Sequence, residues 1–160
     1  MRGTAVRLAA VSAAVCAALA LAGVANADSG ARPLNGDFAS NCTGSSTCLT
    51  FSGHLTHLGR FSGQITSVAT GGQPGCNEPG AAACTTATWT AANGDTINVS
   101  SVFFITGVDP STGLYTFSQA ITINRGSGRF ADATGTATAT GETSATFSTY
   151  FGNISGTIGY

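Results

Sequence analysis

The chain has no lysine and few charges of either sign. All six of its basic residues are arginines, and charged residues make up 8% of its 160 residues. Nucleic acids and anionic membranes are bound through clusters of basic side chains. The composition therefore argues against nucleic acid and against an anionic membrane surface as partners.

Long apolar runs are absent except at the N-terminus, which is typical of a secretory signal peptide. Two arginines open it, residues 8–24 are apolar, and Ala-Asn-Ala at 25–27 fits the A-x-A cleavage rule. The run is short for a spanning helix, so we expect residues 1–27 to be removed and the protein to be secreted without a membrane anchor. From Asp28 on, four arginines face seven acids, a net charge of −3. The lysine-free, Ala- and Gly-rich composition suggests a bacterial source.

Four cysteines follow position 27: Cys42, Cys48, Cys76 and Cys84. An even number in a secreted chain indicates two disulfides, and four cysteines allow three pairings. We favour the local pairs Cys42–Cys48 and Cys76–Cys84, because each brackets a segment dense in Gly, Ser, Pro or Asn, where a short loop closes easily. Secretion and the lack of C-x-x-C spacing argue against a metal site.

From Leu49 onward, apolar and polar residues alternate, as they do in half-buried strands. The pattern predicts strands over 49–55, 61–65, 85–91, 97–106, 115–123, 147–151 and 154–160. Turn signals lie between them, above all ANGD at 92–95 and DPSTG at 109–113. Residues 69–83 have no period and predict a loop. Residues 28–40 mix Pro, Gly and Asn, and we expect a flexible N-terminal arm there.

The segment from 41 to 160 is therefore expected to form one all-β domain. No stretch after position 27 has apolar residues at the spacing of an amphipathic helix. About eight short strands joined by hairpin turns indicate an antiparallel barrel or sandwich. A barrel is preferred, because closure removes the exposed edges of strands so rich in Thr and Gly. The G-x-G-x-x-A outline at 126–131 predicts a turn and no nucleotide cofactor, since a dinucleotide loop leads into a helix and TGTATATG follows here.

Three turn motifs occur in order: THLGRFSG at 56–63, AANGD at 91–95 and GSGRFADATGTATATG at 126–141. They resemble those of secreted bacterial proteins with an allene oxide cyclase-like barrel, and the last is similar to the Gly-Arg-Phe turn of plant dirigent proteins. The resemblance spans roughly residues 49–160 and implies an eight-stranded antiparallel β-barrel with a central cavity. Plant members steer the cyclisation or coupling of reactive apolar intermediates. No stretch of this chain matches their catalytic segments, so no catalytic residue is carried over.

Four residues are candidates for a ligand site inside the barrel: His57, Tyr115, Phe117 and Gln119. His57 keeps phase with the apolar residues before it and could point inward, but we favour a rim residue hydrogen-bonded to the backbone. Gln119 interrupts an apolar face with an amide that needs partners if it is buried, unless a tilted barrel end exposes it to water. His54 and His57 point to opposite faces of a strand and cannot share one metal ion.

The Gly-Arg-Phe sequences around Arg60 and Arg129 suggest arginines that tie barrel corners to carboxylates or loop carbonyls. Asp132 is the expected partner of Arg129. A role for these arginines as anion clamps is the functional alternative. The remaining acids lie mostly in turns, where carboxylates usually accept hydrogen bonds from backbone N–H groups.

No hydrolytic set can be assembled from these residues. No serine lies in a G-x-S-x-G elbow, and the turn acids do not form the opposed pair that a glycosidase needs. The leading hypothesis is a non-catalytic secreted barrel that either binds an apolar small molecule or contributes to the cell exterior. The alternatives are an isomerase or cyclase that shapes a reactive intermediate, and a structural or adhesive surface protein. The sequence leaves the oligomeric state open.

Overall fold

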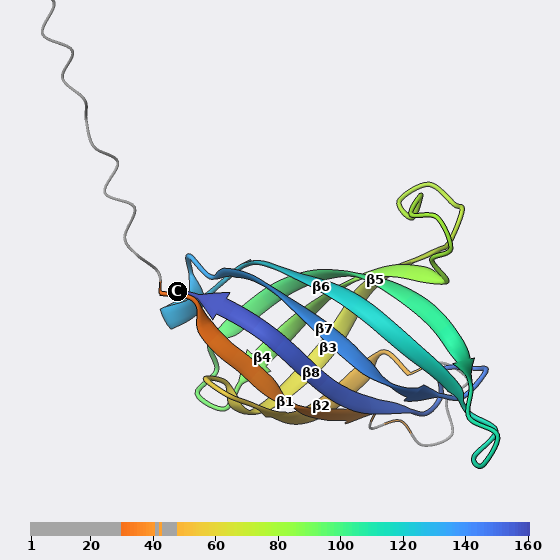
Figure 1. Ribbon diagram of the computed structural model, residues 1–160. Helices are drawn as coiled ribbons and strands as arrows, with labels where there is room; N and C mark the ends of the chain where they lie inside the picture. The colour runs from red at the N-terminus through yellow and green to blue at the C-terminus, as the bar shows by residue number, and fades with distance from the viewer. Residues whose placement is uncertain (1–29, 41, 43–47) are drawn as a thin grey trace, which may run out of the picture.

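The computed structural model describes residues 30–40, 42 and 48–160, and it is a closed antiparallel β-barrel (Figure 1). Each strand pairs with its neighbours along the chain, and β1 closes the barrel against β8. The all-β barrel prediction is confirmed. The strands are β1 (Arg32–Ser40), β2 (Thr50–Leu55), β3 (Gly59–Thr70), β4 (Ala83–Ala91), β5 (Thr96–Val108), β6 (Tyr115–Gly126), β7 (Thr134–Thr143) and β8 (Tyr150–Gly159), with one short 3₁₀ turn, η1 (Gly128–Phe130).

The observed strands differ from the predicted strands in three places. Residues 32–40, expected in a flexible arm, form β1, which buries Leu34 and Phe38 and pairs with both β2 and β8. Residues 134–143, which the strand prediction left out, form β7. The two segments predicted at 147–151 and 154–160 are a turn followed by the single strand β8. The predicted signal peptide at 1–27 lies outside the described residues.

Up-and-down connectivity gives the barrel two different ends. The closed end carries the turns β2–β3, β4–β5 and β6–β7 together with the start of β1 and the C-terminus. The open end carries the connections β1–β2, β3–β4, β5–β6 and β7–β8, and its β3–β4 loop extends away from the barrel (Figure 1).

The closed end is filled with side chains. Phe130 of η1 is fully buried there, and Tyr160 packs edge-on against it with ring centroids 4.8 Å apart. The plug is completed by apolar residues from the adjoining strands and turns: Leu34, Leu55, Leu58, Ile97, Ala133 and Ile158. Eight-stranded barrels hold either packed side chains or one small ligand. At the closed end, packed side chains fill the barrel.

The middle of the barrel is packed with aromatic rings. Phe51 lies 6.0 Å from both Phe38 and Phe61 in edge-to-face geometry, and Phe61 lies 5.6 Å from Trp89. Gly63 makes room for this packing, because a Cβ at its position would overlap the Phe51 ring. Aromatic pairs prefer such edge-to-face contacts, which add to the burial of their surface.

Two disulfides lie towards the open end. Cys42 pairs with Cys48 at a Cα–Cα distance of 5.5 Å, and Cys76 pairs with Cys84 at 5.2 Å. Both local pairings are as predicted. The described part of the chain contains no helix with the length and hydropathy needed to span a membrane.

Candidate ligand-binding site

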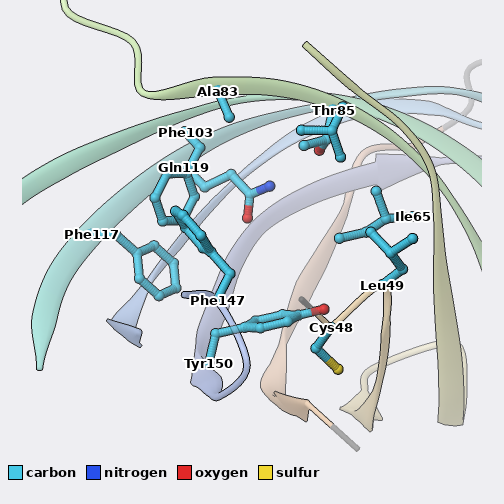
Figure 2. A pocket seen from close by; sticks show the side chains of 11 residues that line it. Cys48, Leu49, Ile65, Ala83, Thr85, Phe103, Phe117, Gln119, Phe147 and Tyr150 are labelled. Carbon is cyan, nitrogen blue, oxygen red and sulfur yellow. The ribbon is translucent and has the colours of Figure 1, made fainter. Parts of the chain in front are cut away.

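A cavity of about 120 Å³ opens beneath the loops of the open end (Figure 2). It lies where β3 and β5 are irregular, with register shifts between Ile65 and Ser67 and between Ile105 and Gly107. Such bulges are common at barrel rims, where they bend a strand and re-aim its side chains. The residues that line the cavity are Cys48, Leu49, Ile65, Val68, Ala83, Thr85, Phe103, Phe117, Gln119, Phe147 and Tyr150.

The wall of this cavity is almost entirely apolar. Phe103 and Phe117 stack on neighbouring strands with centroids 4.7 Å apart and form one side. Leu49 and Val68 are exposed at the rim, with Val68 56% exposed, although they also line the cavity. The cavity therefore communicates with solvent between apolar side chains.

Three polar side chains on neighbouring strands form a short chain of hydrogen bonds beside the cavity. Gln119 Nε2 donates to Ser101 Oγ at 2.7 Å, and Ser101 Oγ lies 2.7 Å from Thr85 Oγ1. Ser101 is buried, and these contacts satisfy its hydroxyl. Gln119 Oε1 accepts no hydrogen bond from any residue that the structure describes. The amide thus brings a free acceptor to an otherwise apolar wall.

Tyr150 contributes the other polar atom. Its ring lies across the base of the cavity in Figure 2, packed at 6.0 Å from both Phe38 and Phe51. Its hydroxyl is buried and has no hydrogen-bond partner among the described residues. Burial raises the pKa of the Tyr150 phenol far above its ordinary value, so the group stays protonated and can donate.

Phe147 covers the cavity from the β7–β8 turn. Its backbone has φ 56°, a left-handed conformation that is unusual for a bulky residue. The turn is held by two hydrogen bonds, from Phe147 N–H to the Ser144 carbonyl at 3.0 Å and from Cys48 N–H to the Phe147 carbonyl at 3.1 Å. Its ring packs edge-to-face on Phe103 at 5.5 Å. Strained residues of this kind cluster at ligand clamps and switch regions.

The structure brings two of the four predicted site residues together. Phe117 and Gln119 both line the cavity. Tyr115, the first residue of β6, lies outside it, 37% exposed at the rim, where it lines a separate hollow on which Phe147 also borders. His57 is in the β2–β3 turn at the closed end, where its ring meets Tyr160 and its carbonyl oxygen accepts from Arg129. His57 thus lies at the rim of the closed end, as one alternative from the sequence had it, but its ring packs against Tyr160 and the hydrogen bond to Arg129 is made by its backbone carbonyl.

The other lining residues were not among the predicted site residues. Thr85 has the inward phase of its strand, as does Ser101 beside the cavity, so strand periodicity places both inside the barrel. Tyr150 shares the phase of the buried Ile154, and this was the available signal for it. Phe147 lies in a turn, where alternation predicts nothing.

The lining offers little chemistry beyond binding. Tyr150 is the one ionisable side chain in the lining, and its proton is held tightly. Among residues 30–40, 42 and 48–160, no group of three His, Cys, Asp or Glu side chains could hold a metal ion.

Comparison with known proteins does not add a family. No family model, no curated protein and no solved structure matches the chain. The site itself must therefore carry the argument about function.

Proposed function

We propose that the protein binds a small apolar molecule in the open-end cavity and does not transform it. The observation that carries this proposal is a solvent-connected apolar cavity in a barrel that is otherwise filled. Its volume, about 120 Å³, is of the order of cavities that stay dry and take up a benzene-sized molecule. Apolar walls with a few convergent polar groups are typical of small-molecule sites.

The proposal favours binding over catalysis because of what surrounds the ligand. Acid–base chemistry needs a group that exchanges a proton near the working pH. Burial raises the pKa of the Tyr150 phenol, and no other residue of the lining titrates, since the Cys48 sulfur is bound in a disulfide. His57, one of the four residues predicted for the ligand site, lies at the closed end, away from this cavity.

As part of the same proposal, we infer a relationship to the allene oxide cyclase-like and dirigent-like proteins that the turn motifs resemble. The closed antiparallel barrel supports this relationship. Two disulfides are compatible with the secretion that residues 1–27 predict, because disulfides persist in oxidising compartments. We propose a binding protein that works outside the cell.

A titration with benzene, followed by amide chemical shifts in NMR, tests the proposal. Saturable shifts are expected at Gln119 and Phe147. Ala83→Leu fills the cavity from its wall and should abolish the shifts, whereas Ala120→Leu on the outer face of β6 is the matched control and should leave them intact. Equal benzene binding by both variants would place any site elsewhere and refute the proposal.

A further inference from the structure

The charges of this barrel are divided between its ends. All four arginines of the described chain lie at the closed end: Arg32 begins β1, Arg60 is the second residue of β3, Arg125 is near the end of β6, and Arg129 is in η1. Arg125 is six residues from Gln119 along one strand, about 20 Å at the rise of a β-strand. That distance exceeds the Debye length of about 8 Å at physiological salt. The arginines therefore do little to attract an anion to the cavity.

The open end has the opposite character. Glu78 lies in the β3–β4 loop, Asp109 in the β5–β6 turn, and Glu142 is the penultimate residue of β7. The described loops and strand ends around the cavity contain no arginine, lysine or histidine, and residues 41–47 carry no charge in the sequence. An anion that approaches the mouth thus meets carboxylates and no cation.

Inside the cavity, the polar atoms are uncharged. Gln119 Nε2 donates one of its two N–H groups to Ser101, the Gln119 Oε1 is an acceptor without a donor among the described residues, and the Tyr150 hydroxyl is a buried donor without a partner there. In Figure 2, the Gln119 side chain extends from the barrel wall into the space above Tyr150. A buried polar atom without a partner costs free energy, which a ligand with a complementary group recovers. A carboxylate placed there would lose its hydration without gaining a cation.

We propose that the cavity takes a neutral molecule, an apolar ring or short chain that carries one uncharged hydroxyl or carbonyl group, and that it rejects the carboxylate of the same shape. The apolar part lies against Phe103 and Phe117. The polar group bonds to the Gln119 Oε1, the Tyr150 hydroxyl or both. This inference rests on the proposed function, since it specifies the chemical class of ligand for the same site.

Three probes with the same ring test whether the cavity accepts a neutral polar group and whether it rejects a carboxylate. They are toluene, benzyl alcohol and benzoate, each titrated at pH 7 into the full disulfide-bonded protein. Benzyl alcohol is expected to bind at least as tightly as toluene, because its hydroxyl regains hydrogen bonds in the cavity. Benzoate is expected to bind at least about tenfold more weakly than benzyl alcohol, since an unpaired buried charge is costly.

Two variants identify the polar groups responsible. Tyr150→Phe removes the phenol oxygen, and Gln119→Leu removes the amide oxygen together with the nitrogen that bonds Ser101; both variants keep most of the side-chain volume. At least one of the two variants should bind benzyl alcohol about five- to tenfold more weakly than wild type, the contribution of one hydrogen bond. Its affinity for toluene should change by less than about twofold. Gln64→Leu is the matched control, because Gln64 is exposed on the outside of β3 and bonds its neighbour's carbonyl.

The outcomes distinguish this inference from the proposed function. If none of the three probes binds, the proposed function itself fails. If benzoate binds as tightly as benzyl alcohol, the cavity is still a binding site but the neutral-ligand inference is overturned. That inference is also overturned if toluene binds wild type while benzyl alcohol affinity is unchanged in both Gln119→Leu and Tyr150→Phe.

Discussion

Arg129 Nε lies 3.7 Å from the Asp95 carboxylate, and the same guanidinium donates to the His57 carbonyl oxygen. Asp95 in turn accepts hydrogen bonds from Asn93 Nδ2 at 2.7 Å and from Arg129 N–H at 3.3 Å. His57, Asp95 and Arg129 belong to three different turns. One arginine therefore joins all three connections of the closed end, which supports a structural role over the anion-clamp alternative.

Arg129→Ala should lower stability without changing ligand binding. The side chain is partly exposed, so its ion pair and its bond to the carbonyl together are worth about 1 to 2 kcal/mol. Arg125→Ala, on the outer face of β6, is the control and should cost under about 0.5 kcal/mol. Thermal melting and the benzene titration measure both effects. A large loss of benzene affinity at an unchanged melting temperature would contradict the structural role.

Gly128→Ala should be more damaging than an ordinary glycine substitution. Gly128 has φ 59°, as its turn role predicted, and a Cβ at that position would collide with the Asp95 carboxylate. The strain of the left-handed backbone alone is worth about 1 kcal/mol. Displacement of Asp95 would add the loss of its contacts with Arg129. The measurement is chemical denaturation, with Gly113→Ala as a control that has positive φ but open space around it.

Alternation predicted much of the fold, and its failures have physical causes. β7 reads TGTATATGET, and it has period two, but its inward residues are Gly and Ala. These small residues carry almost no apolar signal, although Ala137 and Ala139 are buried. β1 has Pro33 and two buried apolar residues four positions apart, which disguised it as an irregular arm. Pairing with β8 stabilises β1, and this pairing joins the first and last strands of the chain, so a local sequence pattern does not reveal it.

The candidate site was predictable only in part for the same reason. Phe117 and Gln119 follow from the phase of a single strand. Tyr115 has the same phase, but it is the first residue of β6 and lies at the rim, beyond the cavity. Asp132 was the wrong partner for Arg129, because proximity in sequence favoured it while the tertiary fold brings Asp95 across from the β4–β5 turn.

Glu142→Gln should stabilise the protein at neutral pH and not in acid. Loss of hydration, a hydrogen bond with Asp109 and repulsion from it raise the Glu142 pKa above its ordinary value of 4.5. A raised carboxyl pKa means that the folded state binds the proton more tightly, so Glu142 favours folding below its ordinary pKa and this contribution is lost as pH rises through the raised pKa. Glutamine keeps a neutral side chain at all pH values.

The effect appears as a difference in melting temperature between wild type and Glu142→Gln across pH 3 to 7. The variant should melt higher at pH 7, and the difference should shrink as Glu142 of the wild type becomes protonated. Asp109 shifts the other way, since hydrogen bonds from Ser111 lower its pKa, and its own contribution is lost only in stronger acid. A difference that grows towards low pH would contradict this assignment.

The last prediction separates the two disulfides by function. Cys48 lines the cavity, and its N–H holds the Phe147 carbonyl over it, whereas Cys84 lies on the outer side of β4. Replacing Cys42 and Cys48 by serine keeps the backbone N–H of residue 48, but loss of the disulfide frees this residue to move away from Phe147, and Phe147 must then be ordered again whenever a ligand binds. Ordering one side chain costs about 0.5 to 1.5 kcal/mol, so benzene affinity should fall by roughly two- to tenfold. The Cys76→Ser, Cys84→Ser pair should lower the melting temperature while leaving affinity within about twofold. Equal losses of affinity in both double variants would mean that general loosening, and not the Cys48–Phe147 contact, controls the cavity.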